Sequence, residues 1–82
     1  MSHSESYTLV TPPEFEVILK KLKQKKPDVL KSLEKKIERV LREPILGKPL
    51  RNSLRNYRRV HIDPFVLIYE ISKLEVRLID FD

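Results

Sequence analysis

The stretch that decides the fold runs from Tyr57 to Ile71 and reads YRRVHIDPFVLIYEI. Its first part, Tyr57 to Ile62, places Arg59 and His61 on one side of an extended chain and apolar side chains on the other. An Asp-Pro pair then favours a turn. The second part, Phe65 to Ile71, is apolar on both sides, which indicates a central strand. The stretch therefore predicts a β-hairpin whose second strand lies inside a sheet.

The elements around this hairpin indicate an α+β domain. Residues 7–10 and 75–81 have the composition of strands, and apolar side chains recur at helical spacing over residues 15–22 and 30–41. Pro27 separates the two helical segments. We expect a two-helix antiparallel hairpin packed on one face of a small, mostly antiparallel four-stranded sheet, with the other face open. The helical side chains expected to cover the sheet are Phe15, Leu19, Leu22, Leu33, Ile37 and Leu41.

Local signals place the ends of these helices. Thr11 is predicted to be the N-cap of the first helix, with Pro12 at the first helical position and Glu14 closing a capping box. Asp28 is predicted to cap the second helix. Gly47, the only glycine, is expected in a loop that needs a positive φ.

Composition limits the class of protein. The chain has 82 residues, so we expect one domain, 1–82, with residues 1–6 frayed. It has no cysteine, and its two histidines are far apart, so we expect no metal site and no cofactor. No apolar run approaches the roughly 20 residues of a membrane span, and the polar start does not resemble a signal peptide. These features predict a cytoplasmic protein.

The charge is positive and unevenly distributed. The net charge is +5, and cations dominate residues 20–36 and 48–59, whereas acids are concentrated near the two ends. A rigid sheet with a positive side favours a phosphate-rich ligand. An acidic protein that covers this side is a second interpretation.

Arg59 and His61 are the candidate catalytic pair. Cleavage of RNA by its own 2′-hydroxyl needs a base, positive charge at the phosphorus and an acid for the leaving oxygen. A histidine titrates near neutral pH, and an arginine can hold two phosphate oxygens. The candidates for RNA phosphate contacts are Lys48, Arg51, Arg55 and Arg58. The alternative is that all of these residues form a solvated surface without a function.

Three segments together resemble the RelE/ParE superfamily of toxins: Gly47-Lys48-Pro49-Leu50-Arg51, then Tyr57 to Ile62, then Phe65 to Ile71. The order of elements is similar over nearly the whole chain. The resemblance implies the toxin of a type II toxin–antitoxin system, with a cognate antitoxin as partner. RelE-like members cleave mRNA in the ribosomal A site and so repress translation, whereas ParE-like members inhibit DNA gyrase.

The resemblance also implies roles for single residues. Arg59 and His61 fall where RelE-like mRNA interferases, which are endoribonucleases, carry two basic residues on the second strand. Their third strand usually carries an arginine where this chain has Val66, and their basic tail would follow Asp82, where the sequence ends. We therefore expect weak cleavage at best, with ribosome and mRNA as partners. A ParE-like topoisomerase inhibitor, a catalytically impaired toxin-fold binding protein and a plain nucleic-acid-binding domain are the alternatives.

Overall fold

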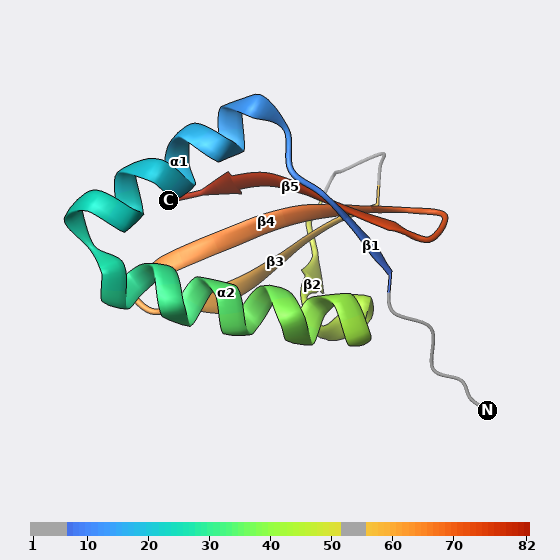
Figure 1. The fold of residues 1–82 in the computed structure, drawn as a ribbon. Helices are drawn as coiled ribbons and strands as arrows, with labels where there is room; N and C mark the ends of the chain where they lie inside the picture. Colours follow the sequence, from blue (N-terminus) through green and yellow to red (C-terminus); the bar gives the residue numbers. More distant parts are fainter. Residues whose placement is uncertain (1–6, 52–55) are drawn as a thin grey trace.

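The computed structural model describes residues 7–51 and 56–82, so the predictions for residues 1–6 and Arg55 lie outside the described residues. Figure 1 shows a helical hairpin beside a twisted sheet. The elements, in chain order, are β1 (Thr8–Val10), α1 (Pro13–Lys25), α2 (Pro27–Arg42), a 3₁₀ turn η1 (Pro44–Leu46), β2 (Lys48–Pro49), β3 (Tyr57–Ile62), β4 (Phe65–Ser72) and β5 (Glu75–Phe81). No helix in these two ranges is long and apolar enough to cross a membrane.

The sheet has the strand order β1-β5-β4-β3-β2. β1 pairs with β5 in parallel, and the other neighbouring strands are antiparallel. The predicted hairpin and the central position of β4 are confirmed, as is the predicted α+β class. The sheet has five strands rather than the expected four, because Lys48 and Pro49 pair with Arg59 and Arg58 of β3 as a short edge strand, β2.

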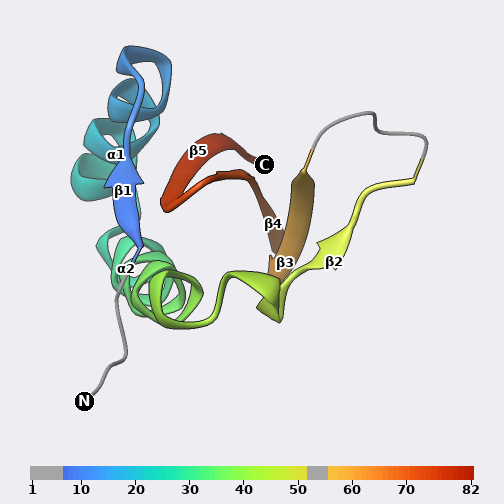
Figure 2. The same ribbon diagram turned by 90° about the vertical axis from the view of Figure 1, so that its right-hand side faces the viewer.

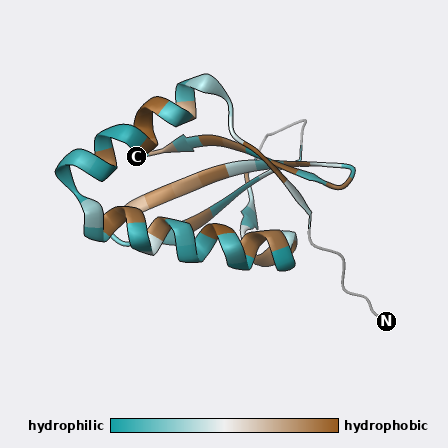
Figure 3. Ribbon diagram, in the orientation of Figure 1, coloured by the Kyte–Doolittle hydropathy of each residue, from teal (hydrophilic) through white to brown (hydrophobic). Residues whose placement is uncertain are grey.

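The helices cover one face of the sheet, as predicted (Figure 2). Phe15, Leu33 and Ile37 are buried in the core against Leu67 and Tyr69 of β4. The other three helical side chains predicted to pack there, Leu19, Leu22 and Leu41, are partly buried against the same cluster. Figure 3 shows the amphipathic pattern that drives this packing, with brown apolar stretches on the strands and on the sides of the helices near them. Burying this apolar surface is the main favourable contribution to folding.

Both predicted helix caps are wrong. The N-cap residue of α1 is Pro12, and its carbonyl oxygen accepts hydrogen bonds from the N–H groups of Phe15 and Glu16, at 2.9 and 3.1 Å. Thr11 therefore lies one residue outside the cap. Lys26 holds the N-cap position of α2, so Asp28 lies inside the first turn. In each case a proline takes the first helical position, where its fixed φ and missing N–H suit the helix, and the cap shifts to the residue before it.

The expectation of a positive φ at Gly47 is also wrong, since its φ is −76° and its ψ is 160°. The glycine is needed for close approach instead. A Cβ at this position would lie 2.6 Å from the hydroxyl oxygen of Tyr69 and 2.7 Å from the carbonyl oxygen of Arg59. The chain between η1 and β2 can therefore lie against the sheet only because residue 47 has no side chain.

Candidate nucleic-acid interface

The sheet face that turns away from the helices, which we call the open face, carries the predicted catalytic pair. Arg59 and His61 are exposed on β3, whereas Val60 and Ile62, which alternate with them, pack into the core. Residues two apart on a strand point to the same side. The prediction that Arg59 and His61 share the open face is therefore confirmed, while their chemical role stays a prediction.

The open face changes in charge from one edge to the other. Lys48 of β2 is in register with Arg59, so their side chains are cross-strand neighbours on this face. On the other side of Arg59 lies Ile68 of β4, and Asp80 of β5 follows in the same row. With neighbouring strands about 4.8 Å apart, Asp80 is roughly 10 Å from Arg59. On this face the cations of β2 and β3 are thus separated from the carboxylate of Asp80 on β5 by the apolar side chain of Ile68 on β4.

A second row of side chains across the open face also runs from a basic residue on β3, through an apolar residue on β4, to a carboxylate. Val66 of β4 is in register with His61, and it exchanges both backbone hydrogen bonds with Asp82, at 3.0 and 3.1 Å. A carboxylate therefore lies two strands away from each member of the catalytic pair. Elsewhere on this face Glu70 and Arg77 form an ion pair at 3.8 Å, so these two charges largely neutralise each other.

A buried hydrogen-bond network holds Lys48 in position beside Arg59. The hydroxyl of Tyr69, whose side chain is fully buried, donates to the carbonyl oxygen of Pro44 at 2.5 Å and accepts from the N–H of Gly47 at 2.9 Å. Burial raises the pKa of this hydroxyl, and the Gly47 hydrogen bond and the charge of Arg58 oppose that shift. The network fixes η1 and the residue before β2 to the centre of the sheet.

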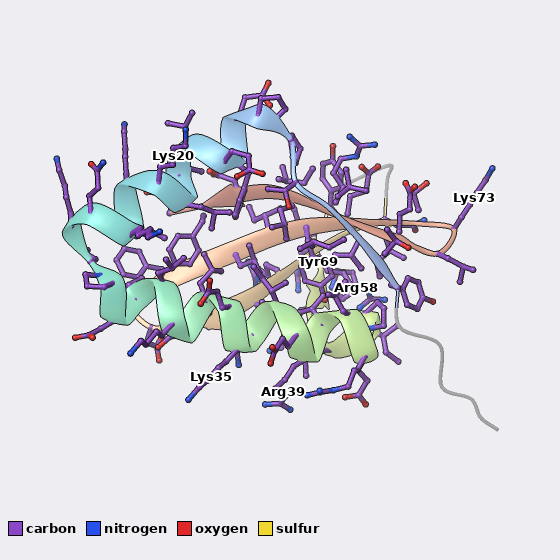
Figure 4. The ribbon with its side chains drawn as sticks, viewed as in Figure 1. Lys20, Lys35, Arg39, Arg58, Tyr69 and Lys73 are labelled. Atoms are coloured by element: carbon purple, nitrogen blue, oxygen red, sulfur yellow. The ribbon has the colours of Figure 1, made fainter. Side chains whose placement is uncertain are left out.

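Arg58 belongs to this network. Its Nη1 donates to the carbonyl oxygen of Gly47 at 2.6 Å, and the residue is in register with Tyr69 on the face that the helices cover. Figure 4 shows the labelled side chains of Arg58 and Tyr69 near each other. The structure therefore separates Arg58 from Arg59 and His61, although all three come from one strand.

Of the other residues predicted to contact phosphates, the structure describes Lys48 and Arg51 but not Arg55. Lys48 lies on the open face beside Arg59, and Arg51 is exposed two residues beyond the end of β2. Arg55 lies outside the described residues. The structure therefore brings Lys48, Arg59 and His61 together from the predicted set.

The sequence interpretation noted the cations of residues 20–36 but did not place any cation of α2 beside β3. Lys35, Lys36 and Arg39 line a hollow of about 450 Å³ together with His61 and Asp63 at the end of β3. The i, i+4 spacing of Lys35 and Arg39 was visible in the sequence, but not the strand that this side of α2 would face. His61 therefore borders both the open face and a basic hollow at the edge of the sheet.

Comparison with known proteins agrees with this architecture. The family model of the ParE toxin of type II toxin–antitoxin systems matches residues 11–81. The chain belongs to the RelE/ParE toxin superfamily. It is also 35% identical over 79 residues to "Putative toxin RelE4" of Methanocaldococcus jannaschii, an alignment that covers 93% of this chain and 84% of that protein. No solved structure gives a significant match.

As a toxin of a type II toxin–antitoxin system, the protein has a cognate antitoxin as its implied partner. In the described part of this toxin, no three His, Cys, Asp or Glu side chains gather as a group that could hold a metal ion. Among the described residues, the open face near β3 carries the cations Lys48 and Arg59, the imidazole of His61 and, in the same alternation, the side chain of Tyr57.

Proposed function

We propose that this toxin represses translation as a ribosome-dependent mRNA endonuclease and that the β3 side of its open face contacts the RNA. The supporting observation is the shared exposure of Arg59 and His61 on one face, with Lys48 in register beside Arg59. Two cations next to an imidazole supply the positive charge and one of the two proton-transfer groups that phosphodiester cleavage needs. The open geometry suits a reaction whose substrate is held by a second large body, the ribosome.

The reaction that these groups suit is attack of the 2′-hydroxyl on the adjacent phosphorus. A base removes the hydroxyl proton, the 2′-oxygen bonds to phosphorus, and the bond to the 5′-oxygen breaks as that oxygen receives a proton. The products are a 2′,3′-cyclic phosphate and a 5′-hydroxyl. In this proposal Arg59 and Lys48 stabilise the negative charge that develops on the phosphoryl oxygens, and His61 transfers one of the two protons.

A ParE-like mode of action, in which the toxin inhibits a topoisomerase by binding, is the second candidate. The match to the ParE toxin model favours it, and so does Val66, because this apolar side chain is the cross-strand neighbour of His61. A valine at this position offers neither charge nor a proton to a phosphate. In this mode the same face would serve as a protein-binding surface.

The antitoxin is proposed to cover the basic side with an acidic helix. Net positive charge speeds association with such a segment, and binding removes the self-repulsion of the cations. Because the proposed RNA contacts lie on the same side, the bound antitoxin would block them.

The test is expression of the toxin with and without the neighbouring open reading frame, combined with toeprinting of a model mRNA on ribosomes. The endonuclease proposal predicts growth arrest without the antitoxin and cuts in the A-site codon. A supercoiling assay with purified gyrase runs in parallel. Growth arrest with intact mRNA and inhibited gyrase would support the ParE-like mode, and harmless expression of the toxin alone would contradict both.

A further inference from the structure

Three cations of α2, which we call the basic flank, line a hollow together with the end of β3: Lys35, Lys36 and Arg39. Lys35 and Arg39 are one helical turn apart, about 6 Å along the axis, and project to the same side of α2 (Figure 4). Like charges at this spacing repel each other and destabilise a helix. None of the three cations has an ion-pair partner among the described residues. The basic flank thus concentrates positive charge that no ion pair among the described residues neutralises.

Two of the three acids of α2, Glu34 and Glu38, lie on another side of the helix, whereas Asp28 lies near Ser32 and the end of β3. Glu34 and Glu38 line a separate, largely apolar hollow between α1 and α2, together with Lys20 and Lys23 of α1. Glu34 and Glu38 therefore lie toward α1, whereas Lys35, Lys36 and Arg39 line the hollow at the end of β3. Three cations against one carboxylate, Asp63, leave a net positive potential over this hollow.

The edge of β3 beside the basic flank has no strand partner in the described part of the chain. β2 pairs only with Arg58 and Arg59, so the outer edge of β3 is uncovered from Val60 to Ile62. The hollow is lined by His61, Ile62 and Asp63 at the end of β3 and by the cations of the basic flank. Because a carboxylate repels an anion, we expect a phosphate to bind near Lys35 and Arg39 and not near Asp63.

We infer that the basic flank and the edge of β3 form a phosphate-binding groove that holds an RNA backbone next to His61. This inference deepens the proposed function, on which its choice of RNA rests. Since His61 borders both the groove and the open face, one RNA strand can contact Lys48 and Arg59 on the open face and continue around the β3 edge to α2. The groove is expected to read backbone charge and not base sequence, because Lys35 and Arg39 are long, exposed side chains that suit phosphate contacts.

The inference is tested with a fluorescein-labelled oligouridylate, whose binding to the full chain is followed by fluorescence anisotropy over a series of KCl concentrations. The double variant Lys35→Gln/Arg39→Gln removes two contacts. Each phosphate contact to a single strand contributes about 0.7 to the slope of log K against log salt, so the slope should become about 1.4 less steep. At 0.1 M salt this corresponds to roughly 25-fold weaker binding.

The matched control is Lys21→Gln/Lys25→Gln on α1, which removes the same charge at the same helical spacing from exposed positions that line neither hollow. It should weaken binding by less than about threefold, because screening limits distant charges. The single variants Lys35→Gln and Arg39→Gln should each lower the slope by about 0.7. Circular dichroism verifies that every variant is folded.

Three results would overturn the inference: no binding of the RNA by the parent chain, no effect of the α2 double variant, or equal effects of the α1 and α2 pairs. Loss of antitoxin binding with unchanged RNA binding would assign the basic flank to the antitoxin and also overturn it. The variant Arg59→Ala is measured for both RNA binding and mRNA cleavage, so that failure of the groove can be distinguished from failure of the proposed function. If the α2 variant loses RNA affinity while no chain cleaves mRNA, the groove stands and the endonuclease proposal fails.

Discussion

Tyr69 and Gly47 form an interlocked pair, and a double-mutant cycle between them tests how the basic edge is held in place. Tyr69→Phe leaves the N–H of Gly47 and the carbonyl of Pro44 without their buried partner. A buried polar group without a partner costs about 1–3 kcal/mol, so two of them should lower the free energy of unfolding by roughly 2–4 kcal/mol. Tyr7→Phe is the matched control, since Tyr7 has no hydrogen bond through its hydroxyl among the described residues. It should cost less than about 0.5 kcal/mol.

Gly47→Ala should destabilise the protein by a different mechanism. The new Cβ would lie 2.6 Å from the Tyr69 hydroxyl and 2.7 Å from the Arg59 carbonyl oxygen, both within the range that real Cβ contacts avoid. Overpacking of this kind costs about 1–3 kcal/mol, to which the weakened Gly47–Tyr69 hydrogen bond adds.

The combined variant Gly47→Ala/Tyr69→Phe removes the collision of the new Cβ with the Tyr69 hydroxyl. The Gly47–Tyr69 hydrogen bond, which each single variant weakens or removes, is lost only once in the combined variant. The destabilisation of the combined variant should therefore be smaller than the sum of the single effects by about 1 kcal/mol. It should still exceed that of Tyr69→Phe alone, because the collision with the Arg59 carbonyl remains. Urea unfolding followed by circular dichroism measures all four chains. Additivity within about 0.3 kcal/mol, or a Tyr69→Phe effect no larger than that of Tyr7→Phe, would refute the interlock.

Four further predictions follow from the structure. Arg59→Ala should lower mRNA cleavage on programmed ribosomes by roughly 10²-fold or more, and His61→Ala by a similar order, with unchanged thermal unfolding because both side chains are exposed. Burial raises the pKa of the Tyr69 hydroxyl above 10.0. Its contribution to stability is therefore present below about pH 10 and is lost as the pH rises through the folded-state pKa. At alkaline pH the urea concentration at the midpoint of unfolding should fall further in the parent chain than in Tyr69→Phe. Lys73→Gly should raise stability by about 0.5 kcal/mol, since Lys73 has a φ of 55°; a lower melting temperature would contradict this. Leu33→Ala should cost about 2–5 kcal/mol in urea unfolding, because Leu33 is fully buried.

The hairpin and both helices were predictable because their signals are periodic and local. The apolar run from Phe65 to Ile71 can be satisfied only by burial on both faces, and β4 is accordingly at the centre of the sheet. β2 was not predictable, since a two-residue strand containing Pro49 has no periodicity of its own. It forms because Lys48 and Pro49 are brought against β3 by the chain that precedes them.

For the candidate site, the sequence could predict only which residues of a single strand share a face, because side chains alternate along a strand. Spacing alone placed Arg59 and His61 on one face. The role of Gly47 could not be read locally, because the two atoms that exclude a side chain there belong to Arg59 and to Tyr69, which is 22 residues away. Arg58 was grouped with its neighbours by charge, although its position in the strand turns it toward Tyr69. The basic flank of α2 needed the fold, because a helix does not reveal which of its polar sides will face a strand.

The most direct test of the central proposal is toeprinting of a model mRNA on programmed ribosomes with the parent chain, Arg59→Ala, His61→Ala and the exposed-lysine control Lys21→Ala in parallel. The proposal predicts A-site cuts by the parent chain and by Lys21→Ala, and a loss of roughly 10²-fold in the two β3 variants. Cuts of equal strength in all four chains would remove Arg59 and His61 from the mechanism. Intact mRNA with every chain, together with growth arrest on expression, would contradict the endonuclease assignment itself.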